Sequence, residues 1–187
     1  MAWIEEAETD GQDLPALFRA LSLDPKSLES VKQLNEALAF GASALNRAQE
    51  EAIATVVAAA NQCRYGAMTH SGFLRRHCAD RSLAGQLIND FARADLGLAD
   101  RRMLEFAVKL TKEPAAVTRQ DVEDLRAVGF EDPQVLSIVL LTCLYNFMNR
   151  LADGLGVDVP PSYQTAMQRW LTGPAAQAQW LMKPKER

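Results

Sequence analysis

The stretch "NRAQEEAIATVVAAANQ", residues 46–62, predicts a helix that is buried on every side. Asn46 is a suitable N-cap, and Gln49 stands at the spacing of a capping box. Residues 52–60 are small or apolar all round the helix, so they leave no polar face for water. Such a helix needs other helices around it, and the stretch therefore indicates a helical core.

Helix signals continue outward from this stretch in both directions. Asp24 and Pro25 suit the N-cap and first position of a helix, and Gly129 suits the end of another. A long apolar helix is expected over residues 132–156, and no strand alternation of any weight is present. We therefore expect an all-α fold of about eight or more helices, with residues 1–187 forming a single domain.

The last part of the chain, residues 161–187, is expected to form a C-terminal helix and an arm. The helix is predicted near residues 162–171. The stretch "PAAQAQWLMKPKER" that follows has few apolar core positions in its pattern. We expect this arm to pack on another subunit.

Composition excludes several classes of partner. The net charge is −4, and lysines and arginines are scattered among acidic residues, which argues against nucleic acid. The acidic start "MAWIEEAETDGQDLP" does not have the pattern of a signal peptide. The apolar run of residues 135–148 is interrupted by polar residues and falls short of the roughly 20 that span a membrane. We expect a cytoplasmic protein without membrane attachment.

The three cysteines give no disulfide framework, because their number is odd and their spacing is wide. Cys78 and Cys143 are expected to be packing residues. Cys63 lies in "NQCRYGAMTH", residues 61–70, together with one of the two histidines. Near a helix start, Cys63 would have its thiolate stabilised by the helix dipole, and Arg64 would act in the same direction.

Helical geometry decides which residue the histidine faces. If residues 63–77 form one helix, His70 lies one turn from Gly66 and two turns from Cys63. Glu51 shares a face of the preceding helix with small residues, so a neighbouring helix could bring an imidazole against its carboxylate. The plain alternatives are a dipole-favouring acid at Glu51, a buried thiol at Cys63 and a core histidine at His70.

No metal or cofactor is expected. His77 follows His70 by seven residues, and two ligands about 10 Å apart along one helix cannot share one ion. The long helix also carries a polar stripe that could pair internally, line a cavity or sit at an interface. It consists of Asn146, Asn149, Arg150 and Asp153.

The stretch "EEAIATVVAAANQCRYGAMTH" resembles the core of the alkylhydroperoxidase AhpD-like proteins, within the carboxymuconolactone decarboxylase superfamily. "FAVKLTKEPAAVTRQDVEDLRAVGFEDPQVL" and "YNFMNRLADGLGV" resemble its branch of uncharacterised peroxidase-related enzymes. The resemblance covers roughly residues 45–160. It implies an all-α fold, a homo-oligomer with sites near subunit contacts, and thiol-based reduction of hydroperoxides.

The resemblance also implies roles for five positions. Glu51 matches the relay glutamate, Cys63 the first motif cysteine, His70 the motif histidine and Tyr65 the aromatic or histidine position of the motif. Gly66 stands where the family has its second cysteine, the one understood to attack the peroxide. The cysteine that remains therefore resembles the resolving partner, which forms the disulfide afterwards.

Three functions stay open. Cys63 could attack a hydroperoxide with His70 and Glu51 as relay, and an external thiol would then release it. His70 and Glu51 could instead perform acid–base chemistry on a small carbonyl or lactone substrate, with Gly66 enlarging the site and Tyr65 lining it. The protein could also be a non-catalytic oligomeric relative that binds a ligand.

Overall fold

The structure is a computed structural model that describes residues 2–7 and 14–184. Within these residues the chain is all-α and has no strand, as predicted, with ten α-helices and three short 3₁₀ turns. Their bounds are α1 Ala16–Arg19, α2 Pro25–Leu38, α3 Arg47–Asn61, α4 Arg64–His77, α5 Leu83–Asp90, η1 Phe91–Arg93, α6 Leu98–Lys112, η2 Pro114–Ala116, α7 Arg119–Ala127, α8 Asp132–Gly154, α9 Pro161–Gln168, η3 Pro174–Gln177 and α10 Gln179–Met182. Eight of the ten helices have eight residues or more.

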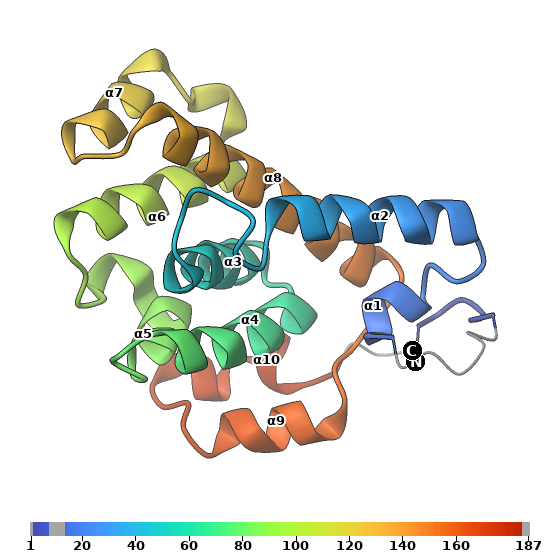
Figure 1. Ribbon diagram of the computed structural model, residues 1–187. Coiled ribbons are helices and arrows are strands. Elements are labelled where there is room, and N and C mark those ends of the chain that lie inside the picture. Colours follow the sequence, from blue (N-terminus) through green and yellow to red (C-terminus); the bar gives the residue numbers. More distant parts are fainter. Residues whose placement is uncertain (1, 8–13, 185–187) are drawn as a thin grey trace.

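Helix α3 occupies the centre of the molecule. It is seen nearly end-on in Figure 1, with α4, α6 and α8 around it. Nine consecutive residues, from Glu50 to Ala58, are buried, which confirms the helix expected to be buried on every side. The predicted capping box between Asn46 and Gln49 is present at its start. Burial of apolar residues all round α3 joins the surrounding helices into one core.

Helix α8 is the second core element. It is 23 residues long and is the one helix in the described part of the chain that is long and apolar enough to cross a membrane by composition. Ile138 and Leu141 are fully buried in the cluster that α3 and α6 also build, and half of the apolar stretch is buried inside the protein. These properties are those of a core helix in a folded globular domain.

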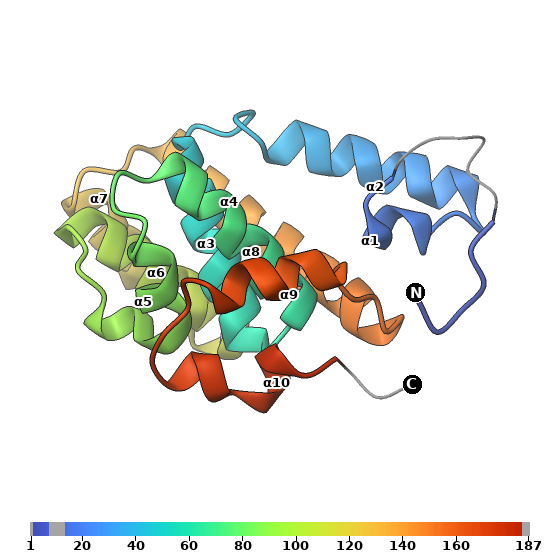
Figure 2. The same cartoon turned by 90° about the horizontal axis from the view of Figure 1, so that it is seen from below.

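The N-terminal helices form a wing on one side of this core. Asp24 caps α2 by accepting hydrogen bonds from the backbone N–H groups of Lys26 and Ser27, as its position predicted. Asn35 is the one buried residue of α2, and the helix extends away from the body (Figures 1 and 2). The wing therefore adds little to the core but forms a wall beside α8.

The C-terminal segment packs against its own chain over residues 174–182, and its contact with another subunit stays a prediction. Leu181 is fully buried and Ala175 nearly so, in a cluster with Ala67 and Met68 of α4. The pattern showed few apolar positions, but Ala175 and Leu181 are among them and join this buried cluster. The helix expected near residues 162–171 is α9, which ends earlier, and residues 185–187 lie outside the described part.

Candidate functional site

The site begins at the junction between α3 and α4, which form the most extensive helix pair in the molecule. Gln62 adopts the left-handed conformation, with φ 55°, and turns the chain at the end of α3. Cys63 is then the N-cap of α4, as the sequence predicted. The small residue Ala58 of α3 and Gly66 of α4 let the two helices approach closely: a Cβ at position 66 would lie 2.9 Å from the Cβ of Ala58.

Glu51 and His70 meet across this junction. The Oε2 atom of Glu51 lies 2.8 Å from Nδ1 of His70, and the Glu51 side chain is completely buried. The predicted contact between the carboxylate and the imidazole is therefore present. A carboxylate at this distance favours the tautomer in which Nδ1–H donates to Glu51, which leaves the lone pair on Nε2.

Arg47 supplies the positive charge that balances this buried carboxylate. Its guanidinium donates to Glu51 and to Glu50, which is also completely buried and accepts further bonds from the Gly41 N–H and the Ser43 hydroxyl. Sequence reasoning missed Arg47 and the role of Glu50. The spacing of three and four residues between Arg47 and the two acids was the signal that could have found them.

His70 lines a cavity of about 530 Å³. Its walls come from α4, α8 and α9, and from residues 14–19 and the end of α2 in the N-terminal wing. Gly66 and Tyr65 line it together with His70, and Tyr145 and Asn149 of α8 face the same space. Glu51 lies behind His70 and does not line the cavity. This is the usual arrangement of a base and the group that orients it.

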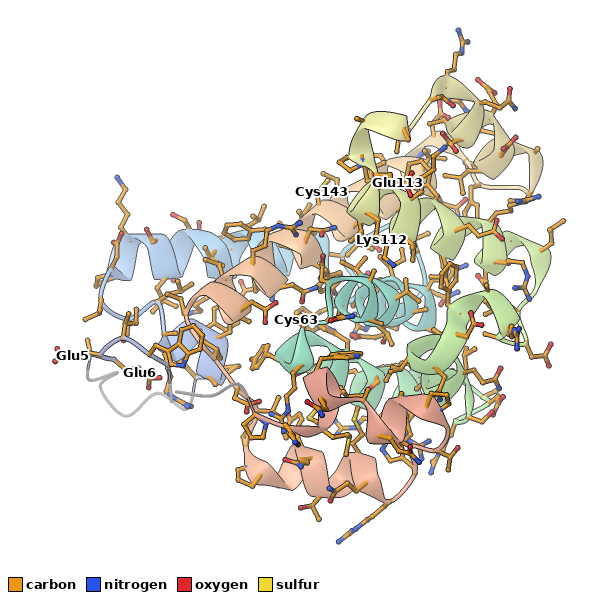
Figure 3. All side chains as sticks on the ribbon, turned by 180° about the vertical axis from the view of Figure 1, so that it is seen from behind. Glu5, Glu6, Cys63, Lys112, Glu113 and Cys143 are labelled. Atoms are coloured by element: carbon orange, nitrogen blue, oxygen red, sulfur yellow. The ribbon has the colours of Figure 1, made fainter. Side chains whose placement is uncertain are left out.

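Cys63 lies outside this cavity. Its side chain is completely buried, among Leu17, Ala152 and Val157, and its thiol donates to the backbone C=O of Asn149 at 3.7 Å. Figure 3 shows Cys63 in the interior, at the start of α4. The structure therefore brings Glu51 and His70 together at the cavity and leaves Cys63 on the other side of the cavity wall.

Arg64 also departs from its expected role beside the thiol. Its guanidinium donates to Asp158, to Gln164 at 2.8 Å and to the C=O of Leu181 at 2.8 Å. Burial lowers the pKa of this guanidinium below its usual value. Arg64 thus fastens the C-terminal segment to α4 instead of stabilising a thiolate at Cys63.

Position 66 is filled from α8. A Cβ built on Gly66 would lie 2.4 Å from Oδ1 and 3.4 Å from Cγ of Asn149. The amide of Asn149 therefore occupies the space that a cysteine side chain at position 66 would need. A residue spacing within α4 carried no information about this contact, because Asn149 comes from another helix.

The polar stripe of α8 divides between two of the roles considered for it. Asn146 pairs internally: it donates to Thr111 at 2.9 Å and accepts from Asn61 at 3.0 Å and from Arg150 at 2.7 Å. Asn149 instead lines the cavity. One residue of the stripe, Asn146, therefore serves the packing of the helices, and another, Asn149, forms part of the cavity wall.

Tyr145 gives the cavity wall a phenol that stays protonated. Burial, and then the nearby charges of Glu51 and Glu50, raise its pKa well above the usual range. Its ring stands at a steep angle to the ring of His70, with 4.7 Å between centroids. The hydroxyl has no hydrogen-bond partner among the described residues.

The other two cysteines, Cys78 and Cys143, differ in their exposure to solvent. Cys78 is half-buried and Cys143 is exposed on α8 (Figure 3), so the expectation that Cys143 is a packing residue is wrong. The periodicity of a long apolar helix did not reveal which of its sides faces water. In the described residues, no group of three or more His, Cys, Asp or Glu side chains could hold a metal ion.

Two solved structures of peroxidase-related proteins resemble this chain. The alkylhydroperoxidase AhpD core protein from Ralstonia eutropha JMP134 has a TM-score of 0.76 and 29% identity, over 80% of this chain and 79% of that one. The peroxidase-related protein from Silicibacter sp. TM1040 has a TM-score of 0.75 and 25% identity, over 86% and 97%.

A third solved structure shares the fold at lower identity. The debrominase Bmp8, in its complex with 2,3,4-tribromopyrrole, has a TM-score of 0.70 and 16% identity, over 89% of this chain and 96% of that one. No family model and no curated protein matches the sequence.

Proposed function

We propose that this chain, whose structure neighbours are AhpD-like peroxidase-related proteins as its sequence predicted, is an acid–base enzyme. In this function, His70 removes a proton from a small carbonyl or lactone substrate held in the cavity, and later returns one. Glu51 is the positioning residue that holds His70 in one tautomer. The observation that carries the proposal is that His70, held by Glu51, lines the cavity while Cys63 does not.

The surroundings of the pair support this chemistry. Arg47 pairs with Glu51 behind the imidazole, and Glu51 does not line the cavity, so the base is held without exposing a carboxylate to the substrate. Aromatic and apolar side chains, including Phe73 and Met148, line much of the cavity. Because water competes little in such a space, a neutral imidazole there is an effective base.

The test is a Kemp elimination, with 5-nitrobenzisoxazole as the probe. The base takes the proton from the ring carbon, the C–H electron pair becomes part of a nitrile, the N–O bond breaks, and the oxygen leaves as a coloured phenolate. We expect turnover by the wild-type protein and a loss of about a hundredfold or more in His70→Gln. The matched control is His77→Gln, at the other end of α4 and outside the cavity.

Equal rates in the two histidine variants would contradict a base at His70. The role of Glu51 needs a separate measurement, because a lost carboxylate also affects folding. ¹⁵N NMR of His70 should show the proton on Nδ1 in the wild type and a mixture of tautomers in Glu51→Gln. An unchanged tautomer would show that Glu51 does not position the ring.

A one-cysteine peroxidase is the second candidate, favoured by the position of Cys63 as the N-cap of α4. The Cys63 thiolate would attack a hydroperoxide oxygen, an alcohol would leave, and the sulfenic acid formed would be reduced by two equivalents of an external thiol. The test follows cumene hydroperoxide with dithiothreitol, and labelling by dimedone.

The two candidates predict opposite patterns in these assays. If the acid–base function holds, Cys63→Ser keeps its Kemp activity, and dimedone does not label Cys63 in the folded protein because the thiol is buried. Cys143→Ser is the matched control, since Cys143 is exposed. Hydroperoxide consumption that disappears in Cys63→Ser alone would favour the peroxidase and overturn the first candidate.

A further inference from the structure

A buried amide lies on the cavity wall, one helix away from the base. Asn149 is only 4% exposed, and its Nδ2 has no hydrogen-bond partner among the described residues. A buried donor left unpaired loses its hydrogen bonds to water without replacement, so folded proteins pair almost all of them. Nδ2 itself is covered and Oδ1 is the amide atom at position 66, so the donor can pair with a ligand in the cavity once a half-turn of the amide about its Cβ–Cγ bond exchanges the two atoms.

Position 66 explains how the amide comes to lie there. With no side chain on Gly66, the space above its Cα is filled by the amide, whose Oδ1 would lie 2.4 Å from a Cβ at that position. Gly66 and His70 are one turn apart on α4 and both line the cavity. The amide of Asn149 is thus held beside the base by a glycine that leaves room for it.

We propose that Nδ2 of Asn149 binds the substrate oxygen that becomes negatively charged when His70 removes the proton. This inference rests on the proposed acid–base function and extends it to a substrate class: small carbonyl compounds that pass through an enolate. The C–H electron pair forms a C=C bond, the carbonyl π pair moves onto oxygen, and the proton resides on Nε2 of His70 until it is returned. No oxidant or reductant is required.

Hydrogen bonds to a charged oxygen are stronger than those to a neutral one, so this donor would favour the enolate over the carbonyl. The amide carries no charge and keeps its donor at every working pH. The amide would therefore stabilise a developing oxyanion more than a thiol at position 66 could, since a thiol is a weak hydrogen-bond donor.

The experiment measures binding of 4-nitrophenolate, an enolate-like anion whose absorbance reports the bound form. We expect Asn149→Leu, which keeps the approximate shape and removes the donor, to bind it about tenfold to a hundredfold more weakly than the wild type. The free energy of unfolding of this variant should stay the same or rise, because an unpaired buried donor has been removed.

The matched control is Ser71→Ala. Ser71 is on α4, completely buried, and its hydroxyl also has no partner among the described residues, but it does not line the cavity. We expect unchanged phenolate binding there. Unchanged binding in Asn149→Leu, or weaker binding together with a clear loss of stability, would overturn the inference.

The two proposals fail in different ways. In one outcome, Kemp activity depends on His70 but the affinity for phenolate does not depend on Asn149. That outcome would support His70 as the base and overturn the oxygen-binding role of Asn149. Absence of His70-dependent turnover would instead remove the base, whatever the phenolate result.

Discussion

Asn149 and Gly66 share one space: the amide oxygen of Asn149 lies 2.4 Å from where the Cβ of any larger residue at position 66 would stand. Ala58 stands behind it at 2.9 Å. The contact joins α8 to α4 at the cavity wall. Position 66, where the second cysteine of the motif is replaced by glycine, therefore lies against a side chain that comes 83 residues further along the chain.

We therefore predict that Gly66→Ala destabilises the protein by about 1–3 kcal/mol, because a methyl group is forced against a packed amide. Gly72 on the same helix is the matched control, since nothing lies within 4 Å of a Cβ built there. Gly72→Ala should stabilise by about 0.5–1 kcal/mol, through the higher helix propensity of alanine. Urea denaturation measures both; a stabilised Gly66→Ala would contradict the contact.

The same contact predicts the result of restoring a cysteine. Gly66→Cys alone should be destabilised, whereas adding Asn149→Ala should recover part of the loss and give a coupling energy above about 1 kcal/mol in a double-mutant cycle. Additive changes would show that the two positions do not compete for space. Hydroperoxide consumption in the double variant would show whether the thiol at 66 then works with His70.

Arg47 is predicted to contribute strongly to the stability of the fold. Arg47→Met leaves two completely buried carboxylates, Glu50 and Glu51, without their shared cation, and we expect a loss of about 3–5 kcal/mol. Arg119, which pairs with Glu123 on the surface, is the control: Arg119→Met should change stability by about 0.5 kcal/mol or less. Similar urea midpoints for the two variants would contradict this prediction.

Stability in acid should depend on Asp121. The hydrogen bond from Lys109 and the capping of α7 lower the pKa of Asp121 to about 2. Because its folded pKa lies below the unfolded value of about 3.9, its contribution is present above pH of about 4 and is lost as the pH falls toward 2. In Asp121→Asn the free energy of unfolding should fall less steeply over this pH range than in the wild type. Parallel curves of unfolding free energy against pH for the two proteins would argue against the Lys109–Asp121 pair.

Stability in alkali should depend on Tyr145. Burial raises its pKa, so its contribution is complete below the unfolded value of about 10 and decreases as the pH rises above it. Tyr145→Phe should remove this alkaline loss. At neutral pH the variant should be more stable by about 1 kcal/mol, because an unpaired buried hydroxyl is gone. Chemical unfolding at pH 7 and above pH 10 checks both expectations.

Local signals in the sequence predicted the helices well, because caps and periodicity act within a few residues. The capping box at Asn46 and Gln49, the cap at Asp24 and the buried character of α3 are all present. The one-turn spacing of Gly66 and His70 likewise follows from helix geometry alone. The contact of Glu51 with His70 could be anticipated because small residues on α3 allow close approach.

Other features depend on contacts between distant segments, which periodicity does not contain. The pattern could not show that α8 exposes Cys143, that Arg64 turns to the C-terminal segment, or that Leu181 joins the core. It also could not place Asn149 above Gly66.

The sequence by itself determined that this protein is all-α, that its centre is a helix buried on every side, and that its cysteine motif has lost the thiol one turn from His70. The tertiary structure decided what replaces that thiol and where the remaining one lies. The reason is packing: which side chain fills the space left by a glycine depends on the helix that crosses it. Here α8 crosses, bringing an amide to the cavity and covering Cys63 with its backbone.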